Sequence, residues 1–318
     1  MSPGTSPGMR RGRGRLLPLL LFGVLAVLPL LPLGPSRGYI LLLVSRVMVL
    51  GLAALSLDLI LGAGGMVSFG HAAYLTLGAY AVAVLDANGI AEAWAVVPAA
   101  LAAAGLFALA TGAIALRTQG VNFIMITLAF AQMVYFAAGS LAAYGGDDGY
   151  SLVARTQLFG WKLLDGRAFY FSAWLLLVAG WLLCRILLDS PFGRVLQAIR
   201  QNRQRVQAMG YNPFAVQLAA MVVAGMLCAL AGVLLANNAE FVSPAYGAWQ
   251  RSGDLLIMVI LGGAGSLHGA ILGAGFVVLL EEGLSRVTEH WRLIYGPLLV
   301  LSVLLFRGGF AGIGGRRD

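Results

Sequence analysis

The chain has few charged residues for its length. Of its 318 residues, 11% are Asp, Glu, Lys or Arg and 60% are hydrophobic, and the mean hydropathy is +0.87. Soluble domains carry about 25% charged residues, because polar side chains must cover much of their surface. The shortage argues against a water-soluble enzyme, a disordered chain and a fibrous protein. The composition predicts an all-α polytopic membrane protein, a bundle of transmembrane helices.

Residues that bind nucleotides or metals are also scarce. Lys162 is the single lysine and follows Trp161, so the chain has no Gly-Lys-[Ser/Thr] phosphate-binding loop. The three histidines are too scattered for a recognisable metal site, and the two cysteines lie in apolar runs without a CxxC motif. We therefore expect a protein that is not an enzyme, with no catalytic residue and no metal or cofactor bound by this chain.

The net charge of +8 would suggest a nucleic-acid partner in a soluble protein. Here the arginines lie in short segments beside apolar runs, where they set membrane topology, so we expect the lipid bilayer as partner and no nucleic acid. With both termini in the cytoplasm, most basic residues fall inside, and of the acids only Asp189 and Asp318 do so. The sequence thus predicts a cytoplasmic tail over 1–15, a transmembrane domain over 16–306 and a cytoplasmic tail over 307–318.

Apolar runs divide the transmembrane domain into about eight to ten spans. Most reach the roughly 20 residues that cross about 30 Å of hydrocarbon. A split stretch, 252–261 and 270–280, gives two pieces that are each too short to span comfortably, which predicts broken or re-entrant helices. We expect the first span, 16–33, to be an uncleaved helix and not a secretory signal peptide. The other predicted spans are 39–61, 67–85, 94–116, 121–143, 168–188, 215–236 and 293–306.

The loop 189–214 is the longest basic segment between spans. Ser190-Pro191 is a helix start signal, and Gly210 with Asn212-Pro213 is a stop signal, so the loop predicts one short helix. The residues alone leave two interpretations open: a connector held near anionic lipid, or a docking helix for a cytoplasmic partner. The predicted apolar face is Val195, Ile199, Val206 and Met209, with Arg200, Arg203 and Arg205 largely off it.

Two glycine-rich segments resemble each other. Residues 61–73, LGAGGMVSFGHAA, and 261–270, LGGAGSLHGA, each follow an acid, Asp58 or Asp254, and each lead into Leu-Gly-Ala. One interpretation is a two-fold structural repeat whose broken helices meet near the membrane midplane, where free backbone groups bind a zwitterion. The other is convergence of glycine-rich membrane helices, and the sequence leaves both open.

Six blocks in one order resemble a known family. The chain is similar to the permease subunits of ATP-binding-cassette (ABC) importers for branched-chain amino acids, from about residue 40 to residue 315. The blocks are 65–80 (GMVSFGHAAYLTLGAY), 123–132 (FIMITLAFAQ), 145–149 (GGDDG), 190–200 (SPFGRVLQAIR), 261–273 (LGGAGSLHGAILG) and 288–291 (TEHW).

The resemblance implies a subunit of the bacterial inner membrane that imports a branched-chain or related small amino acid. Its implied partners are a second homologous permease subunit, two cytoplasmic ATPases that carry ATP and Mg²⁺, and an extracytoplasmic substrate-binding protein. The loop 189–214 then becomes the coupling helix that docks on an ATPase. A rival interpretation is a stand-alone ion-coupled secondary transporter or channel for a small polar solute.

The resemblance also suggests two sets of site residues. The set for coupling to the ATPase is Pro191, Phe192, Gly193, Arg194, Arg200, Asn202 and Gly210. The set for the translocation path is Ser68, Gly70, His71, Thr127, Gly146, Asp147, Gly263 and Ser266. The chain departs from the family at Gln201-Asn202-Arg203, where an acidic Glu-Asn-Glu-like triplet is common, so we expect an ATPase partner with a more acidic groove.

Overall fold

A computed structural model describes residues 13–30, 37–157, 166–288, 290–305 and 309–310. These residues form a bundle of helices with a single two-stranded antiparallel sheet among them, which confirms the all-α prediction. The helices are α1 (Arg13–Val27), α2 (Arg37–Asp58), α3 (His71–Ala87), α4 (Ala93–Ala115), α5 (Val121–Ser140), α6 (Gly166–Asp189), α7 (Pro191–Gln201), α8 (Arg203–Ala208), α9 (Pro213–Ala239), α10 (Trp249–Gly262), α11 (Leu267–Val287) and α12 (Trp291–Leu305); the strands are β1 (Tyr150–Ser151) and β2 (Phe241–Val242).

Six of the described helices are long and apolar enough to cross a membrane. They are α2 with the turn that follows it, α4, α5, α6, α9 and α11, which makes the chain a multi-pass membrane protein. The predicted tails, 1–15 and 307–318, lie largely outside the described residues.

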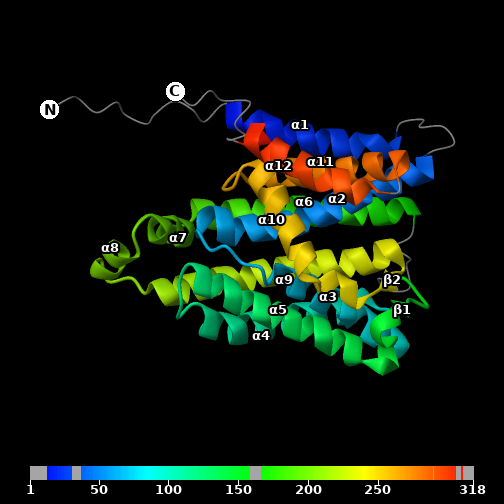
Figure 1. The fold of residues 1–318 in the computed structure, drawn as a ribbon, viewed down its shortest axis with the longest axis horizontal. Coiled ribbons are helices and arrows are strands. Elements are labelled where there is room, and N and C mark those ends of the chain that lie inside the picture. The colour runs from blue at the N-terminus through cyan, green and yellow to red at the C-terminus, as the bar shows by residue number, and fades with distance from the viewer. Residues whose placement is uncertain (1–12, 31–36, 158–165, 289, 306–308, 311–318) are drawn as a thin grey trace.

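The long helices run side by side along the length of the bundle (Figure 1). Helices α7 and α8 stand at one end, and β1 and β2 stand at the other. The start of α1 and the end of α12 lie toward the α7 end, as an even number of crossings requires. Residues 1–12 and 311–318 lie outside the described part of the chain, and the side of the membrane on which the termini lie stays a prediction.

Small residues let the central helices approach closely. On α9, the residues Ala220, Ala224, Cys228 and Gly232 are buried and recur every four positions. A Cβ at Gly232 would collide with the carbonyl of Leu75 on α3. This packing of backbone against backbone is typical of membrane helices, where small side chains replace the hydrophobic effect as the basis of association.

Two predicted spans have different boundaries in the structure. The span predicted from residue 67 begins only at His71, because residues 64–70 are not helical. In the split stretch, α11 has 21 residues and is long enough to cross, whereas α10 has 14. Helix α11 continues beyond residue 280, and Glu281, the first residue after the predicted apolar piece, pairs with Arg46 of α2 at 3.2 Å.

Candidate coupling site at two helix breaks

The loop 189–214 folds into two helices, not the single helix that the sequence predicted. The Ser190 side chain accepts a hydrogen bond from the Gly193 N–H at 3.4 Å, and Pro191 occupies the first turn of α7. Asn202 leaves the helical conformation, and its side chain accepts from the Arg205 N–H at 2.9 Å, so it ends α7 and caps α8. Gly210 then turns the chain with a φ of +86°.

The inner face of the two helices also differs from the prediction. Leu196, Ile199 and Val206 are buried, whereas Met209 is 59% exposed and lies off the face. Because the helix is interrupted at Asn202, the 3.6-residue spacing of α7 does not continue into α8. A prediction that assumes one continuous helix therefore places Met209 on the wrong face. Gly193 is buried against the backbone of Leu188, so α7 folds tightly onto the end of α6. Of the other predicted coupling residues, Pro191 and Arg194 are exposed and Phe192 is half-buried.

The two glycine-rich segments are breaks between helices, as predicted. Helix α2 continues as a π-helical turn, Leu59–Ala63, and the chain is then non-helical up to the start of α3. The second break, 263–266, separates α10 from α11, with φ of +101° at Gly263 and +90° at Gly265. Glycine tolerates these left-handed angles, whereas a side chain would be strained there.

The two breaks meet, and Asp58 joins them. Its carboxylate is 1% exposed and accepts a hydrogen bond from the Gly265 N–H at 2.7 Å. A Cβ at Gly62 would collide with both Asp58 Oδ1 and the Gly265 nitrogen, so only glycine fits there. A charged acceptor makes a stronger hydrogen bond than a neutral one, which suits a contact between two interrupted helices.

Arg200 connects α7 to the first break and lies beside the second. Its Nη1 donates a hydrogen bond to the Gly62 carbonyl. A Cβ at Gly65 would lie 2.8 Å from Arg200 Cγ, and one at Gly265 would lie 3.9 Å from Arg200 Nη1. Arg200 thus brings parts of both breaks next to α7, and their expected place near the membrane midplane stays a prediction. A movement of α7 would reach both of them through one side chain.

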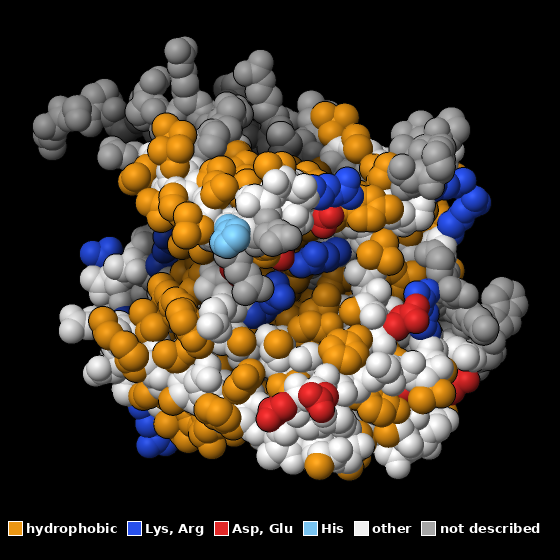
Figure 2. Space-filling view, turned by 45° about the vertical axis from the view of Figure 1, so that its right-hand side comes forward, with side chains coloured by type: hydrophobic (Ala, Val, Ile, Leu, Met, Phe, Trp, Pro, Cys, Tyr) orange, Lys and Arg blue, Asp and Glu red, His pale blue; other side chains and the backbone are white. Residues whose placement is uncertain are grey.

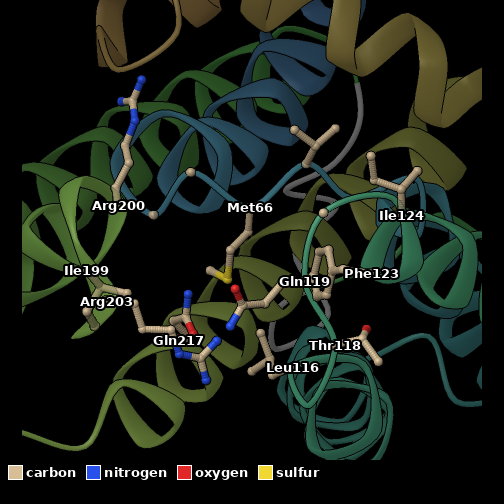
Figure 3. A pocket seen from close by; sticks show the side chains of 14 residues that line it. Met66, Leu116, Thr118, Gln119, Phe123, Ile124, Ile199, Arg200, Arg203 and Gln217 are labelled. Carbon is tan, nitrogen blue, oxygen red and sulfur yellow. The ribbon is translucent and has the colours of Figure 1, made fainter. Parts of the chain in front are cut away.

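A cavity of about 250 Å³ opens beside Arg200 (Figure 3). Its wall comes from the first break, the turn between α4 and α5, α7 and α9. Gln217 is 8% exposed, and its Oε1 has no hydrogen-bond partner among the described residues. Figure 3 shows Gln119, Met66 and Gln217 projecting into one space, with Arg203 beside Gln217. The sequence offered no signal for Gln217 or Gln119, because both belong to the cavity only through the fold.

Four of the predicted translocation residues gather at the start of α3. Thr127 Oγ1 of α5 accepts from the Phe69 N–H at 3.3 Å, and Ser68 Oγ accepts from the Gly70 N–H at 3.1 Å. A Cβ at Gly70 would lie 2.9 Å from the Thr127 carbonyl. His71 is fully buried, with Nε2 2.8 Å from Ser56 Oγ of α2.

The other four predicted residues lie elsewhere. Gly146 and Asp147 belong to a 3₁₀ turn next to β1, at the end of the bundle opposite α7. Gly263 and Ser266 form the second break, where Ser266 Oγ donates to the Gly263 carbonyl at 2.6 Å. The eight residues therefore occupy three places along the bundle, and their common role in a path stays a prediction.

The proposed two-fold repeat also stays a prediction. The two breaks touch, but their acids differ in surroundings: Asp58 bonds across the breaks, whereas Asp254 lies 3.8 Å from Arg251 on its own helix. The helices that lead into the breaks differ in length as well, with 22 residues in α2 and 14 in α10.

Comparison with known proteins places the chain in a family. A family model described as "Branched-chain amino acid transport system / permease component" matches residues 39–303. The high-affinity branched-chain amino acid transport system permease protein LivM is 27% identical in Salmonella typhimurium and 28% identical in Escherichia coli K12, over 90% of this chain and 73% of each relative. The autoinducer 2 import system permease protein LsrC of Escherichia coli DH10B is 27% identical over 82% of this chain and 69% of the relative. No solved structure matches the chain.

Proposed function

The chain belongs to the family of permease components of branched-chain amino acid transport systems, and on that premise we propose that it imports a branched-chain or related small amino acid. It would do so as the membrane-spanning subunit of an ABC importer. Apolar residues such as Leu106, Phe136 and Leu175 are more than 60% exposed, as helices that face lipid require.

The contact of Arg200 with the first break carries this proposal. An ABC importer needs a segment at its cytoplasmic end that transmits movement of the ATPases to the membrane helices. Helices α7 and α8 protrude at one end of the bundle, and Arg200 donates from α7 to the Gly62 carbonyl. ATP and Mg²⁺ would bind to the partner ATPases, so this chain would itself carry out no hydrolysis.

The proposed assembly has this chain beside a second, homologous permease subunit, above two ATPases and below an extracytoplasmic substrate-binding protein. Both termini would face the cytoplasm of a bacterium across its inner membrane. The positions of α1, α7 and α12 support this orientation, because the start of α1 and the end of α12 point toward the end that carries the basic α7–α8 segment.

Reconstitution tests the proposed function. The permease pair, the ATPases and the binding protein would be placed in proteoliposomes, and uptake of leucine, isoleucine and valine would be measured with and without ATP. Phenylalanine and urea serve as comparison substrates, and autoinducer 2 is included because LsrC is an import permease for it. ATP-dependent uptake of leucine supports the proposal. Uptake by this chain without the ATPases, driven by an ion gradient, would overturn it.

A further inference from the structure

We propose that a cavity of mixed charge between α10, α11 and α12 holds the ammonium and carboxylate groups of a zwitterionic amino acid on its way through the bundle. This inference rests on the proposed function and adds a site to it. The cavity measures about 430 Å³, and its wall includes Arg251, Asp254, Glu281 and Tyr295.

Two ion pairs that sum to zero charge lie at the cavity: Arg251, Asp254 and Glu281 are on its wall, and Arg46 behind the wall pairs with Glu281. Arg46 of α2 lies 3.2 Å from Glu281 of α11, and Arg251 lies 3.8 Å from Asp254 on α10. The four side chains are 26–31% exposed, so they are neither fully buried nor fully exposed to solvent. Charged groups within a membrane bundle generally face protein or a water-filled cavity, and they mark pathways for polar solutes.

The balance of charges favours a zwitterion over a simple ion. A cluster of one sign would attract an anion or a cation, whereas Arg251 beside two carboxylates offers both signs within one cavity. The planar guanidinium matches a carboxylate, which it binds with two parallel hydrogen bonds. Asp254 and Glu281 would accept from the ammonium group. If the ligand carboxylate binds Arg251 and its ammonium group binds Asp254, that pair opens while Arg46 keeps Glu281, so no charge is left without a counterion.

The cavity also has an apolar side that suits a branched side chain. Trp291 and Tyr295 of α12 lie on its wall, with their ring centroids 5.6 Å apart in an edge-to-face contact. Aromatic rings provide a large hydrophobic surface with little loss of conformational freedom. One wall of charge and one of aromatic rings match the two ends of a molecule such as leucine.

The location agrees with import. The cavity residues on α10 and on α12 lie in the first turns of these helices, and both helices run from there toward the α7 end (Figure 1). Figure 2 views this side of the molecule and shows a hollow in which basic and acidic side chains lie among hydrophobic ones. In the proposed orientation this hollow faces the binding protein, so the cavity is placed to receive a ligand from outside.

Protection from thiol labelling tests the site directly. Ala248 lines the cavity and is half-buried, so Ala248→Cys would place one reactive thiol there in the full complex with its ATPases. The native Cys184 and Cys228 are buried and should not react with a membrane-impermeant thiol reagent. We expect millimolar L-leucine to slow labelling at least fivefold. Val153→Cys, at a residue that is 85% exposed outside the cavity, is the control whose labelling leucine should not change.

Two leucine analogues separate recognition of the zwitterion from simple apolar binding. Isoamylamine lacks the carboxylate, and 4-methylpentanoate lacks the ammonium group. Both should protect Ala248→Cys much less than leucine does. Equal protection by all three compounds, or no protection by leucine, would overturn the proposal. ATP-dependent uptake in the same proteoliposomes is scored separately, so a transporter that works without leucine protection refutes this site and leaves the proposed function intact.

Charge-neutralising variants give a second measurement. Arg251→Gln and Asp254→Asn, each combined with Ala248→Cys, should raise the leucine concentration for half-protection about tenfold. The matched control is Arg286→Gln on α11, whose partner Glu282 lies 3.3 Å away outside the cavity. Basal ATP hydrolysis by each complex shows that it assembles. If both cavity variants assemble and bind leucine like the control, the ion pairs are structural only and the proposal fails.

Discussion

The buried carboxylate of Asp58 accepts a hydrogen bond from the backbone N–H of Gly265, 207 positions later in the chain, at 2.7 Å. The bond joins the turn that ends α2 to the turn that begins α11. Neither turn pairs all its backbone groups within a helix, so a side-chain acceptor stabilises a geometry that helices alone would not hold. Arg200 of α7 bonds the carbonyl of Gly62 in the same turn.

Replacement of Asp58 by leucine should destabilise the permease. Leucine removes the acceptor, so the hydrogen bond from the Gly265 N–H is lost, and a hydrogen bond to a charged group contributes about 1.5–3 kcal/mol. Asp58→Asn keeps an acceptor oxygen and should lose less. Thermal unfolding of the purified complex measures both. Asp148→Leu, in an exposed turn, is the control, and equal unfolding temperatures for Asp58→Leu and the control would contradict the assigned role.

Gly62→Ala should impair transport through the same contact. The added Cβ would collide with Asp58 Oδ1 and the Gly265 nitrogen, so the two breaks would have to separate. We expect at least a tenfold fall in ATP-dependent uptake. Gly283→Ala on α11 is the matched control, because no atom lies within 4 Å of its added Cβ. Uptake that falls equally in both variants would point to a general effect of alanine and not to the breaks.

The sequence predicted the elements of this region better than their contacts. Ser190, Pro191 and Gly210 determine the backbone of their immediate neighbours. The start and end of the α7–α8 segment can therefore be predicted without knowledge of the fold. Asn202 has the same local chemistry as a helix cap, yet the pattern of the loop predicts one continuous helix through it. A cap signal inside a pattern that looks helical carries more weight than the pattern, because it changes the backbone conformation at that residue.

Contacts between distant segments could not be predicted from the residues alone. The partner of Arg46 is an example: a charge in a span generally needs a counterion, but Glu281 follows a piece, 270–280, that the sequence predicts to be too short to cross. The resemblance between 61–73 and 261–270 did suggest that both segments are breaks between helices and that the two breaks meet. It could not show that Asp58 would bridge them while Asp254 would pair with Arg251.

Gly70→Val should stop transport while the complex still assembles. Gly70 precedes α3, and a Cβ there would lie 2.9 Å from the Thr127 carbonyl, so a branched side chain would push α5 away from the start of α3. Uptake in proteoliposomes and copurification of the ATPases measure the two effects. Gly253→Val on α10, where a Cβ would meet no atom within 4 Å, is the control. Normal uptake by Gly70→Val would remove this position from the translocation path.

Arg200→Ala should uncouple ATP hydrolysis from transport. Without the guanidinium, α7 loses its hydrogen bond to the Gly62 carbonyl, so a movement of α7 would reach the breaks less effectively. We expect the number of amino acids imported per ATP hydrolysed to fall at least fivefold, while basal hydrolysis continues. Arg117→Ala, which removes an exposed arginine between α4 and α5, is the control. An unchanged ratio in Arg200→Ala would show that coupling uses another route.

The pair Gln201→Glu and Arg203→Glu should weaken binding of the ATPase encoded beside this chain. Both residues stand at the junction of α7 and α8, where Gln201 is exposed and Arg203 lines the cavity that also contains Gln217. The two changes replace one positive charge by two negative ones, which repel the acidic groove expected on this ATPase. Copurification at low and high salt measures the effect, since screening should reduce it. Gln207→Glu, exposed on α8, controls for a single added charge. Unchanged or tighter association of the double variant would show that the groove is not acidic.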